Sequence, residues 1–437
     1  MFQKAYWLLF FCVFVVPSGS WAQNEILNIR HWVAPDHTRF VIDTSQESKF
    51  RLEKKDRRVQ LIIEGASLPP KLSGLHVFNK PGLASAFLSA WPPSSVSIEL
   101  NMPSVLQANV FKLKKFRDKA DRIVIDIILP EAEQQERKSR EEAKLKKIER
   151  IVVIDPGHGG DDPGAVGKRG LYEKKAVLDI SRKLRDILNA RGGYRAFLTR
   201  SGDYYVPFKK RLTIAREYGA DLFLSIHADA SKNRAARGSS VYCISSGAAS
   251  SEAARILANN ENLADVIGGV PAEEENCASD PIILDMFQRH VINQSQSFGR
   301  ILLKELKVVN KLKFEDVQKA PFYVLKLPEI PSVLLEAAFV SNPEEEKLLK
   351  KEIFQKRIAL AVANSVVNFL PPLPGSDKKQ GHASSARIFY TIKRGDTLSS
   401  IAREHGTTAG NLKELNHLKK PDLLYVGKKL IVPAKKQ

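Results

Sequence analysis

Residues 151–177 read IVVIDPGHGGDDPGAVGKRGLYEKKAV, and this stretch indicates both the fold and the site. It begins with a run of branched apolar residues, which predicts a strand buried on both faces of a sheet. The strand leads into a glycine-rich loop that carries His158, and Glu173 follows at the start of an expected helix. Side chains at the carboxyl ends of strands in an α/β sheet converge on one crevice, so this loop is the first candidate for a functional site.

The region 151–370 continues in the same way. The apolar segments YRAFLT, LFLSIHA and SVLLEAAF alternate with helical stretches, among them residues 176–191 and 344–370. Apolar strands interleaved with helices predict a central α/β domain with a mostly parallel, twisted sheet that helices flank. Two of these strands supply further candidates, because LFLSIHA carries His227 near its end and SVLLEAAF carries Glu336 within an apolar run.

These residue types suit a metal site. A buried carboxylate without a partner is costly, so it normally serves a cation or takes part in proton transfer. Two imidazoles and one carboxylate, with a fourth position open to water, form a common zinc site. We therefore expect His158, Glu173 and His227 to hold one zinc ion, with the loop glycines bending closely around it. The sequence lacks the His-Glu-x-x-His spacing of metalloproteases, and GAVGKRG is not a complete phosphate-binding loop.

The flanking regions differ from this central domain. Five short alternating segments within residues 24–130 (ILNIRHWV, TRFVIDTS, VQLIIEG, SVSIEL and RIVIDIIL) predict an all-β sandwich or barrel. Residues 131–150 are almost entirely polar, which favours a solvated helix or a charged linker. Residues 371–387 form a second linker, rich in Pro, Gly, Ser and Lys. The last segment, 388–433, is expected to be strand, helix, helix, strand, and Asp396 or Thr397 is placed to cap its first helix.

Charge and the N-terminus restrict the possible partners. The 437-residue chain carries a net charge of +19, which favours nucleic acid, anionic lipid or an anionic cell wall as partner. Lys4 precedes a short apolar run and small residues up to Ala22, the pattern of a signal peptide over residues 1–22. An uncleaved anchor is the alternative, although the run is short for a membrane span. Export argues against a nucleic-acid partner, and we expect no stable membrane span after cleavage.

Two cysteines, Cys243 and Cys277, remain in the exported chain. They either pair in an oxidising compartment or are buried as small apolar side chains.

Four segments, VVIDPGHGGDDPGAVG, YEKKAVLDIS, ADLFLSIHAD and PSVLLEAAFVSNPEEEKLL, occur in this order and together resemble the zinc-dependent N-acetylmuramoyl-L-alanine amidases of the periplasmic cell-separation type. By that resemblance His158, Glu173 and His227 are zinc ligands, and Glu336 is the catalytic carboxylate. The resemblance implies a periplasmic hydrolase at the division septum. It would cleave the amide bond between N-acetylmuramic acid and L-alanine in peptidoglycan so that daughter cells separate. The alternatives are an inactive peptidoglycan-binding scaffold or activator, and a zinc peptidase or deacetylase acting on other wall bonds.

The flanking domains carry resemblances of their own. Residues 24–130 resemble the AMIN domain, which implies septal targeting and peptidoglycan binding. The segment YTIKRGDTLSSIAREHGTTAGNLKELN, together with LYVGKKLIVP, resembles a LysM module, which implies binding to glycan that contains N-acetylglucosamine. The candidate glycan contacts of this module are Gly395, Asp396, Thr397 and Leu398.

Residues 250–293 are too many for a simple connection in such a fold. The amidase resemblance implies that they form a helical plug, which covers the zinc until a LytM-type activator displaces it. Glu261 is the first candidate for a plug residue that reaches the metal, and the EEEN segment at 273–276 is the second. The alternative is that all these glutamates lie on a solvated face.

Overall fold

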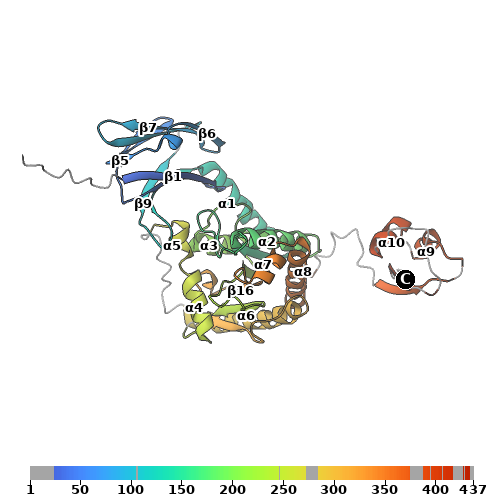
Figure 1. The fold of residues 1–437 in the computed structure, drawn as a ribbon. Helices are drawn as coiled ribbons and strands as arrows, with labels where there is room; N and C mark the ends of the chain where they lie inside the picture. The colour runs from blue at the N-terminus through green and yellow to red at the C-terminus, as the bar shows by residue number, and fades with distance from the viewer. Residues whose placement is uncertain are drawn as a thin grey trace, which may run out of the picture. The chain divides into compact units, whose positions relative to one another are not determined.

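A computed structural model describes residues 24–104, 107–245, 247–271, 284–374, 387–393, 395–405, 407–416, 427 and 429–433. The chain divides into two compact units, residues 1–373 and 374–437 (Figure 1). The expected signal peptide, Cys277 and the EEEN segment lie outside the described residues. Within the described part, no helix combines the length and the hydropathy needed to cross a bilayer.

The N-terminal region is a sandwich of two five-stranded sheets, with strand orders β5-β1-β2-β10-β9 and β3-β4-β8-β7-β6. The alternating apolar residues of both sheets face inward and form one core, in which Ile26, Phe40, Leu61 and Ile125 are fully buried. The strands are β1 (Asn24–Val33), β2 (His37–Thr44), β3 (Lys49–Lys55), β4 (Arg58–Glu64), β5 (Ala66–Ser67), β6 (Gly74–Lys80), β7 (Leu83–Trp91), β8 (Ser95–Asn101), β9 (Ala108–Leu113) and β10 (Asp121–Ile128), with a short 3₁₀ turn η1 (Pro70–Leu72).

Strands β3, β5, β6, β7 and β9 were not predicted from the sequence. Strand β3, KFRLEKK, is the clearest case, because five of its seven residues are Lys, Arg or Glu and it gives almost no apolar signal. Both β3 and β6 lie at the edges of their sheet. Charged side chains are tolerated at a sheet edge, where they also discourage pairing with other chains.

The charged segment after the sandwich is a helix, α1 (Pro130–Leu145), with proline in its first turn. One side of α1 packs on α3 (Phe208–Tyr218), where Arg140 is buried. The Arg140 guanidinium pairs with Glu217 of α3 at 3.0 Å and with Glu136 of its own helix at 2.5 Å. The helical alternative for this segment is therefore correct, and charged residues form its contact with the next domain.

The central domain contains a six-stranded sheet in the order β12-β11-β13-β16-β14-β15. All neighbours pair in parallel except β14 and β16, which are antiparallel, so the sheet is mixed but mostly parallel. Its strands are β11 (Arg150–Pro156), β12 (Tyr194–Leu198), β13 (Leu222–His227), β14 (Ser240–Ile244), β15 (Gln318–Ala320) and β16 (Ser332–Glu336).

Each face of this sheet has its own core. Val152 and Ile154 face the helices α2 (Glu173–Asn189), α6 (Leu284–Lys307) and α8 (Glu352–Phe369). Ile151 and Val153 face the opposite layer, because side chains alternate along a strand. That layer consists of α3, α4 (Glu252–Glu261) and α5 (Ala264–Gly268) (Figure 1), together with the 3₁₀ turn η2 (Tyr323–Leu325). Every central strand is thus covered on both faces, as its continuous apolar sequence predicted.

The helix expected over 344–370 is in fact two helices, α7 (Pro343–Leu349) and α8. Lys351 adopts an extended conformation between them. The Gln355 amide donates to the Leu349 carbonyl at 2.7 Å, which satisfies an acceptor at the end of α7. The sequence prediction of one continuous helix is wrong here, because the apolar periodicity continues across the break between α7 and α8.

The C-terminal unit contains β17 (Arg387–Thr391), α9 (Leu398–Glu404), α10 (Ala409–Leu415) and β18 (Lys429–Pro433), and the two strands pair antiparallel. Its described elements follow the predicted order around a small core that includes Ile401, Leu412 and Val432. Thr397, one of the two predicted caps, begins α9, because its hydroxyl accepts from the Ser400 amide at 3.1 Å.

Glu346 of α7 holds the loop that leads to Glu173. Its carboxylate is fully buried and accepts from the backbone N–H of Arg169 at 2.9 Å and of Leu171 at 3.3 Å. A side chain on Gly167 would place its Cβ 2.4 Å from Glu346 Oε1, so the loop packs directly on this carboxylate.

We predict that Glu346→Ala lowers the free energy of unfolding of the central domain by about 2–3 kcal/mol, because it leaves the buried Leu171 N–H and the partly buried Arg169 N–H without an acceptor. Urea unfolding followed by circular dichroism at 222 nm measures this. The matched control is Glu344→Ala on the same helix, which removes only an exposed ion pair with Lys347 and should leave the midpoint unchanged. Equal midpoints for the two variants would contradict the prediction.

Candidate metal centre

Three strand ends bring the candidate residues together. His227 is the last residue of β13 and Glu336 the last of β16, and the two are direct partners in the parallel pairing of these strands. On the other side of β13, the chain leaves β11 at Pro156, and the Gly157 amide donates to the Ile226 carbonyl at 3.0 Å. His158 follows at once, so the sheet delivers all three side chains to one edge.

The glycine-rich loop closes tightly over this edge. His158 itself adopts a left-handed conformation with φ of 60°. A Cβ on Gly157 would lie 2.3 Å from His227 Cε1, and a Cβ on Gly164 would lie 2.6 Å from Glu173 Oε2. Neither position has room for any side chain, which explains why glycines occur there.

The three expected ligands meet in a buried cluster. His158 Nε2 lies 3.1 Å from His227 Nδ1. Glu173 Oε1 lies 3.2 Å from that His158 nitrogen and 3.3 Å from that His227 nitrogen. All three side chains are almost completely buried.

Glu261, at the end of α4, joins the same cluster. Its Oε2 lies 3.0 Å from His227 Nδ1 and 3.5 Å from His158 Nε2. The ligand atoms of these three residues all lie within 4.8 Å of one another, so they could hold a metal ion. The buried Oε2 has no hydrogen-bond partner among the described residues. The segment from which a plug residue was expected therefore does place a carboxylate against both histidines.

The geometry and charge of this cluster suit zinc. Zinc bonds to nitrogen and oxygen of about 2.0–2.1 Å place tetrahedral ligand atoms about 3.4 Å apart. Five separations among the four donor atoms run from 3.0 to 3.5 Å. Two carboxylates with two neutral imidazoles carry a charge of −2, which a divalent cation balances. The residues present therefore fit the ion that the sequence predicted.

Neighbouring groups fix the orientation of the ligands. Glu173 Oε2 accepts from the Ala165 amide at 2.8 Å, and its Oε1 accepts from the Ala228 amide at 2.7 Å. The His158 Nδ1 lies 2.7 Å from Asp162 Oδ2, which leaves Nε2 directed at the cluster. Asp162 was missed in the sequence analysis. The acidic pair after HGG was the available signal, since a carboxylate often orients a ligand histidine.

Charge coupling within the cluster is strong. Burial lowers the pKa of His227, but Glu261 and Glu173 outweigh it and raise this pKa to about 9. Burial acts in the same way on His158, and Asp162, Glu173 and Glu261 raise its pKa well above the ordinary value. The carboxylates thus favour positive charge at this place, whether carried by protons or by a metal ion.

Glu336 stands in a different environment from Glu173. It is fully buried, and neither carboxyl oxygen has a hydrogen-bond partner in the part of the chain that the structure describes. Burial raises its pKa well above the usual range, and Asp229 and Glu173 add to this effect. Burial also raises the pKa of Asp229 to about 6, although Lys313 binds that carboxylate at 3.0 Å. A carboxyl group with unpaired oxygens can exchange protons, so Glu336 suits general acid–base chemistry.

A second buried cluster, formed by Arg200, Arg211 and Asp155, supports the loop that carries His158. It was also missed in the sequence analysis. Arg200 donates to the carbonyl oxygens of Pro156 at 3.0 Å, Gly157 at 2.7 Å and Lys174 at 2.9 Å, and so ties the end of β11 to the start of α2. Beside it, Arg211 pairs with the fully buried Asp155 at 3.2 Å. An arginine in a sequence gives no sign of whether it is buried, so only the structure identifies these roles.

The candidate glycan contacts of the C-terminal unit lie in one turn. Gly395 has a positive φ of 93°. Asp396 Oδ2 accepts from the Lys393 amide at 2.7 Å and from the Tyr390 hydroxyl at 2.9 Å. Thr397 caps α9, and the Leu398 side chain is buried in the core. Asp396 and Thr397 stabilise the turn through these hydrogen bonds, and contact with glycan stays a prediction.

Comparison with known proteins identifies the domains. A family model described as N-acetylmuramoyl-L-alanine amidase matches residues 152–368, and a LysM domain model matches residues 390–433.

Whole-chain relatives agree with these matches. The amidase AmiC of Escherichia coli O6:H1 is 33% identical over 369 residues, which cover 78% of this chain and 88% of that protein. AmiC of Neisseria meningitidis serogroup B is 32% identical over 371 residues, covering 78% and 89%. AmiA of Escherichia coli K12 is 43% identical over 231 residues, covering 53% and 80%. The chain therefore belongs to the N-acetylmuramoyl-L-alanine amidase family, and it carries an amidase domain and a LysM domain.

Proposed function

We propose that this protein is a zinc hydrolase that cleaves the amide bond between N-acetylmuramic acid and L-alanine in peptidoglycan. The observation that carries this proposal is the unpaired carboxyl of Glu336 beside the converging atoms of His158, His227 and Glu173. The relatives reported above are all named N-acetylmuramoyl-L-alanine amidases, which supports the same reaction.

His158, Glu173 and His227 would hold one zinc ion, which when bound supplies a Lewis acid that activates a water molecule. Glu336 accepts a proton from the attacking water on a carboxylate oxygen. A C–O bond forms at the lactyl carbonyl carbon and the C–N bond to L-alanine breaks. Glu336 then donates the proton to the leaving nitrogen and returns to the carboxylate form.

We propose further that the protein acts in the periplasm at the division septum, after cleavage of a signal peptide over residues 1–22. Residues 24–130 would serve as an AMIN-like domain and residues 388–433 as a LysM module, both bound to peptidoglycan. The linkers would be residues 131–150 and 371–387, on either side of a catalytic domain over 151–370. The net charge of +19 suits a wall rich in carboxylates.

We also propose that the insert, about residues 250–293, inhibits the enzyme and that a LytM-type activator displaces it. Glu261 would occupy the place where water and substrate must enter. The insert is fastened close to this residue. Asp265 Oδ1 accepts from the Tyr205 hydroxyl at 2.7 Å and from the Phe208 amide at 3.0 Å. The Asn262 amide donates to the Pro321 carbonyl at 2.9 Å.

We predict that His158→Ala reduces bound zinc at least about tenfold, because it removes one of the converging donors. Zinc content per chain is measured by plasma mass spectrometry after dialysis. The matched control is His290→Ala, an exposed histidine on α6, which should retain zinc. Equal zinc in both variants would show that the metal binds elsewhere.

We predict that Glu336→Gln lowers turnover about 10²–10⁴-fold while zinc content stays constant, because the amide cannot shuttle the proton. Turnover is measured as stem peptides beginning at L-alanine released from purified peptidoglycan, in the full chain and again in the Glu261→Ala background. Glu315→Gln, an exposed glutamate, serves as the control. Full activity of Glu336→Gln would remove this residue from the mechanism.

We predict that Glu261→Ala raises basal turnover about 10- to 150-fold, because charge-assisted contacts worth about 1.5–3 kcal/mol no longer hold the insert closed. The control is Glu252→Ala at the other end of α4, which alters only an exposed pair with Arg255. Basal turnover that is the same for both variants, with or without an activator, would contradict the inhibitory role.

A further inference from the structure

The N-terminal sandwich contacts the loop that carries His158. Asp161 on that loop is buried, and three cations of the sandwich converge on it. Arg122 Nη1 binds Asp161 Oδ2 at 3.0 Å, and Arg30 Nη1 pairs with Asp161 Oδ1. Lys119 Nζ donates to the Asp161 carbonyl at 2.9 Å. One acidic residue on the loop that carries His158 is thus bound by residues of β1, β10 and the loop before β10.

The charges at this contact are well matched. Burial would raise the pKa of Asp161, but Arg30, Lys119 and Arg122 hold it below its ordinary value. Arg30 is itself fixed by Asp43, with its Nε 2.8 Å from Asp43 Oδ2. A buried charge that loses its partners is strongly disfavoured, so this contact fixes where the sandwich meets the loop.

The same face of the sandwich also binds the insert through hydrogen bonds. Arg39 Nη1 donates to the carbonyl oxygens of Gly268 at 2.9 Å and Gly269 at 3.0 Å. The last carbonyl groups of a helix receive no hydrogen bond from N–H groups of the same helix, so a donor from outside satisfies them. Asp126 on β10 holds Arg39 in place through two contacts of 2.8 and 2.7 Å. Arg122 reaches the Ile267 carbonyl at 3.4 Å.

The approach at Gly269 is close. This residue has a left-handed φ of 81°, and a Cβ on it would lie 2.9 Å from Leu113 Cδ1 and 3.1 Å from Arg39 Nη1. Leu113 is the last residue of β9. The insert backbone therefore packs directly on the edge of the sandwich, and a side chain at this position would displace the ends of Leu113 and Arg39.

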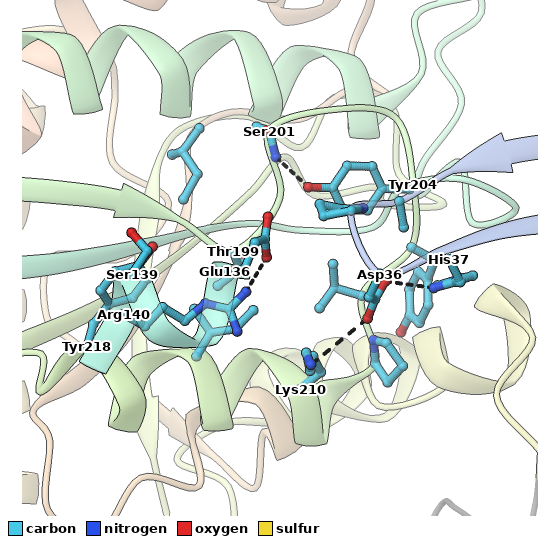
Figure 2. Close-up of a pocket in the computed structure, with 17 residues that line it drawn as sticks. Asp36, His37, Glu136, Ser139, Arg140, Thr199, Ser201, Tyr204, Lys210 and Tyr218 are labelled. Atoms are coloured by element: carbon cyan, nitrogen blue, oxygen red, sulfur yellow. Dashed lines mark hydrogen bonds and ion pairs between the residues drawn. The ribbon is translucent and has the colours of Figure 1, made fainter. Parts of the chain in front are cut away.

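The remaining part of this seam is less completely packed. Ala34, in the turn between β1 and β2, is buried in the same cluster as Tyr204 and Tyr205. Beside it lies a cavity of about 230 Å³, lined by residues of the sandwich, α1 and α3. Figure 2 shows Asp36 between His37 and Lys210 there, at 2.7 Å from His37 Nδ1 and 3.9 Å from Lys210 Nζ. A seam with polar groups around a hollow resembles separable interfaces between domains more than a continuous core.

We propose that Arg39, Leu113 and Arg122 form a docking surface whose occupant is the C-terminal end of α5, residues 267–269, and that this contact holds Glu261 against the two histidines. The second part rests on the proposed inhibitory role of the insert. The sandwich binds the loop that carries His158 through Asp161, and it binds α5 through Arg39. It therefore fixes the insert relative to the loop from outside the catalytic domain. Opening of the insert then requires that the sandwich release α5.

Hydrogen–deuterium exchange on the full chain tests this docking surface. Two variants weaken it independently: Arg39→Ala removes the donor to Gly268 and Gly269, and Leu113→Asp places a carboxylate against the Gly269 backbone. The matched control is Arg51→Ala on β3, in the sheet of the sandwich that does not carry Arg39 or Leu113. This change removes only an exposed ion pair with Glu64 of the neighbouring strand β4. Exchange in β2 and β10 reports whether the sandwich stays folded in each variant.

We expect exchange over residues 262–271 to rise about tenfold or more in both docking variants, with the control unchanged. Basal release of stem peptides should rise in the same variants. Unchanged exchange over 262–271 in variants with an intact sandwich would overturn the docking surface, even if Glu261→Ala activates the enzyme. Faster exchange without any gain in turnover, in these variants and in Glu261→Ala alike, would support the docking and overturn the inhibitory role of the insert.

Discussion

Two carboxylates held within about 3.5 Å of two buried imidazole nitrogens form the constraint on which the rest of the structure depends. Such a group is unfavourable in a protein interior unless positive charge is present among its members. The raised pKa of His227, caused by Glu261 and Glu173 against the effect of burial, expresses the same requirement. A divalent cation would meet this requirement with no added protons, which supports the proposal that the cluster is a metal site.

The fold supplies the support that this constraint demands. Parallel strands deliver His227 and Glu336 to one edge, and backbone N–H groups of Ala165 and Ala228 fix both oxygens of Glu173. Arg200 anchors the loop through backbone carbonyls, so the position of His158 depends on a residue that never touches the cluster. Both carboxyl oxygens of Glu336 are left without hydrogen-bond partners among the described residues, in agreement with a role in proton transfer.

The parts of the site that follow strand ends could be predicted from the sequence, because a buried parallel strand has a distinctive apolar run and its carboxyl end has a known direction. His158, His227 and Glu336 were found in this way, and Glu173 followed from its place at a helix start. The partners that act across the fold could not be predicted. Asp155 and Arg211, or Asp161 and Arg122, are far apart in the sequence, and nothing local distinguishes a buried ion pair from a solvated one. The charged strand β3 was missed for a related reason, since an edge position permits polar residues that hide the strand period.

The most direct test of the metal site is zinc K-edge absorption spectroscopy on the purified full-length protein. We predict a four-coordinate ion with nitrogen and oxygen neighbours at about 2.0–2.1 Å, including two imidazoles, and the same coordination number in Glu261→Ala, in which water takes the place of the carboxylate. Sulfur neighbours at about 2.3 Å, or a protein that binds no zinc at all, would contradict it.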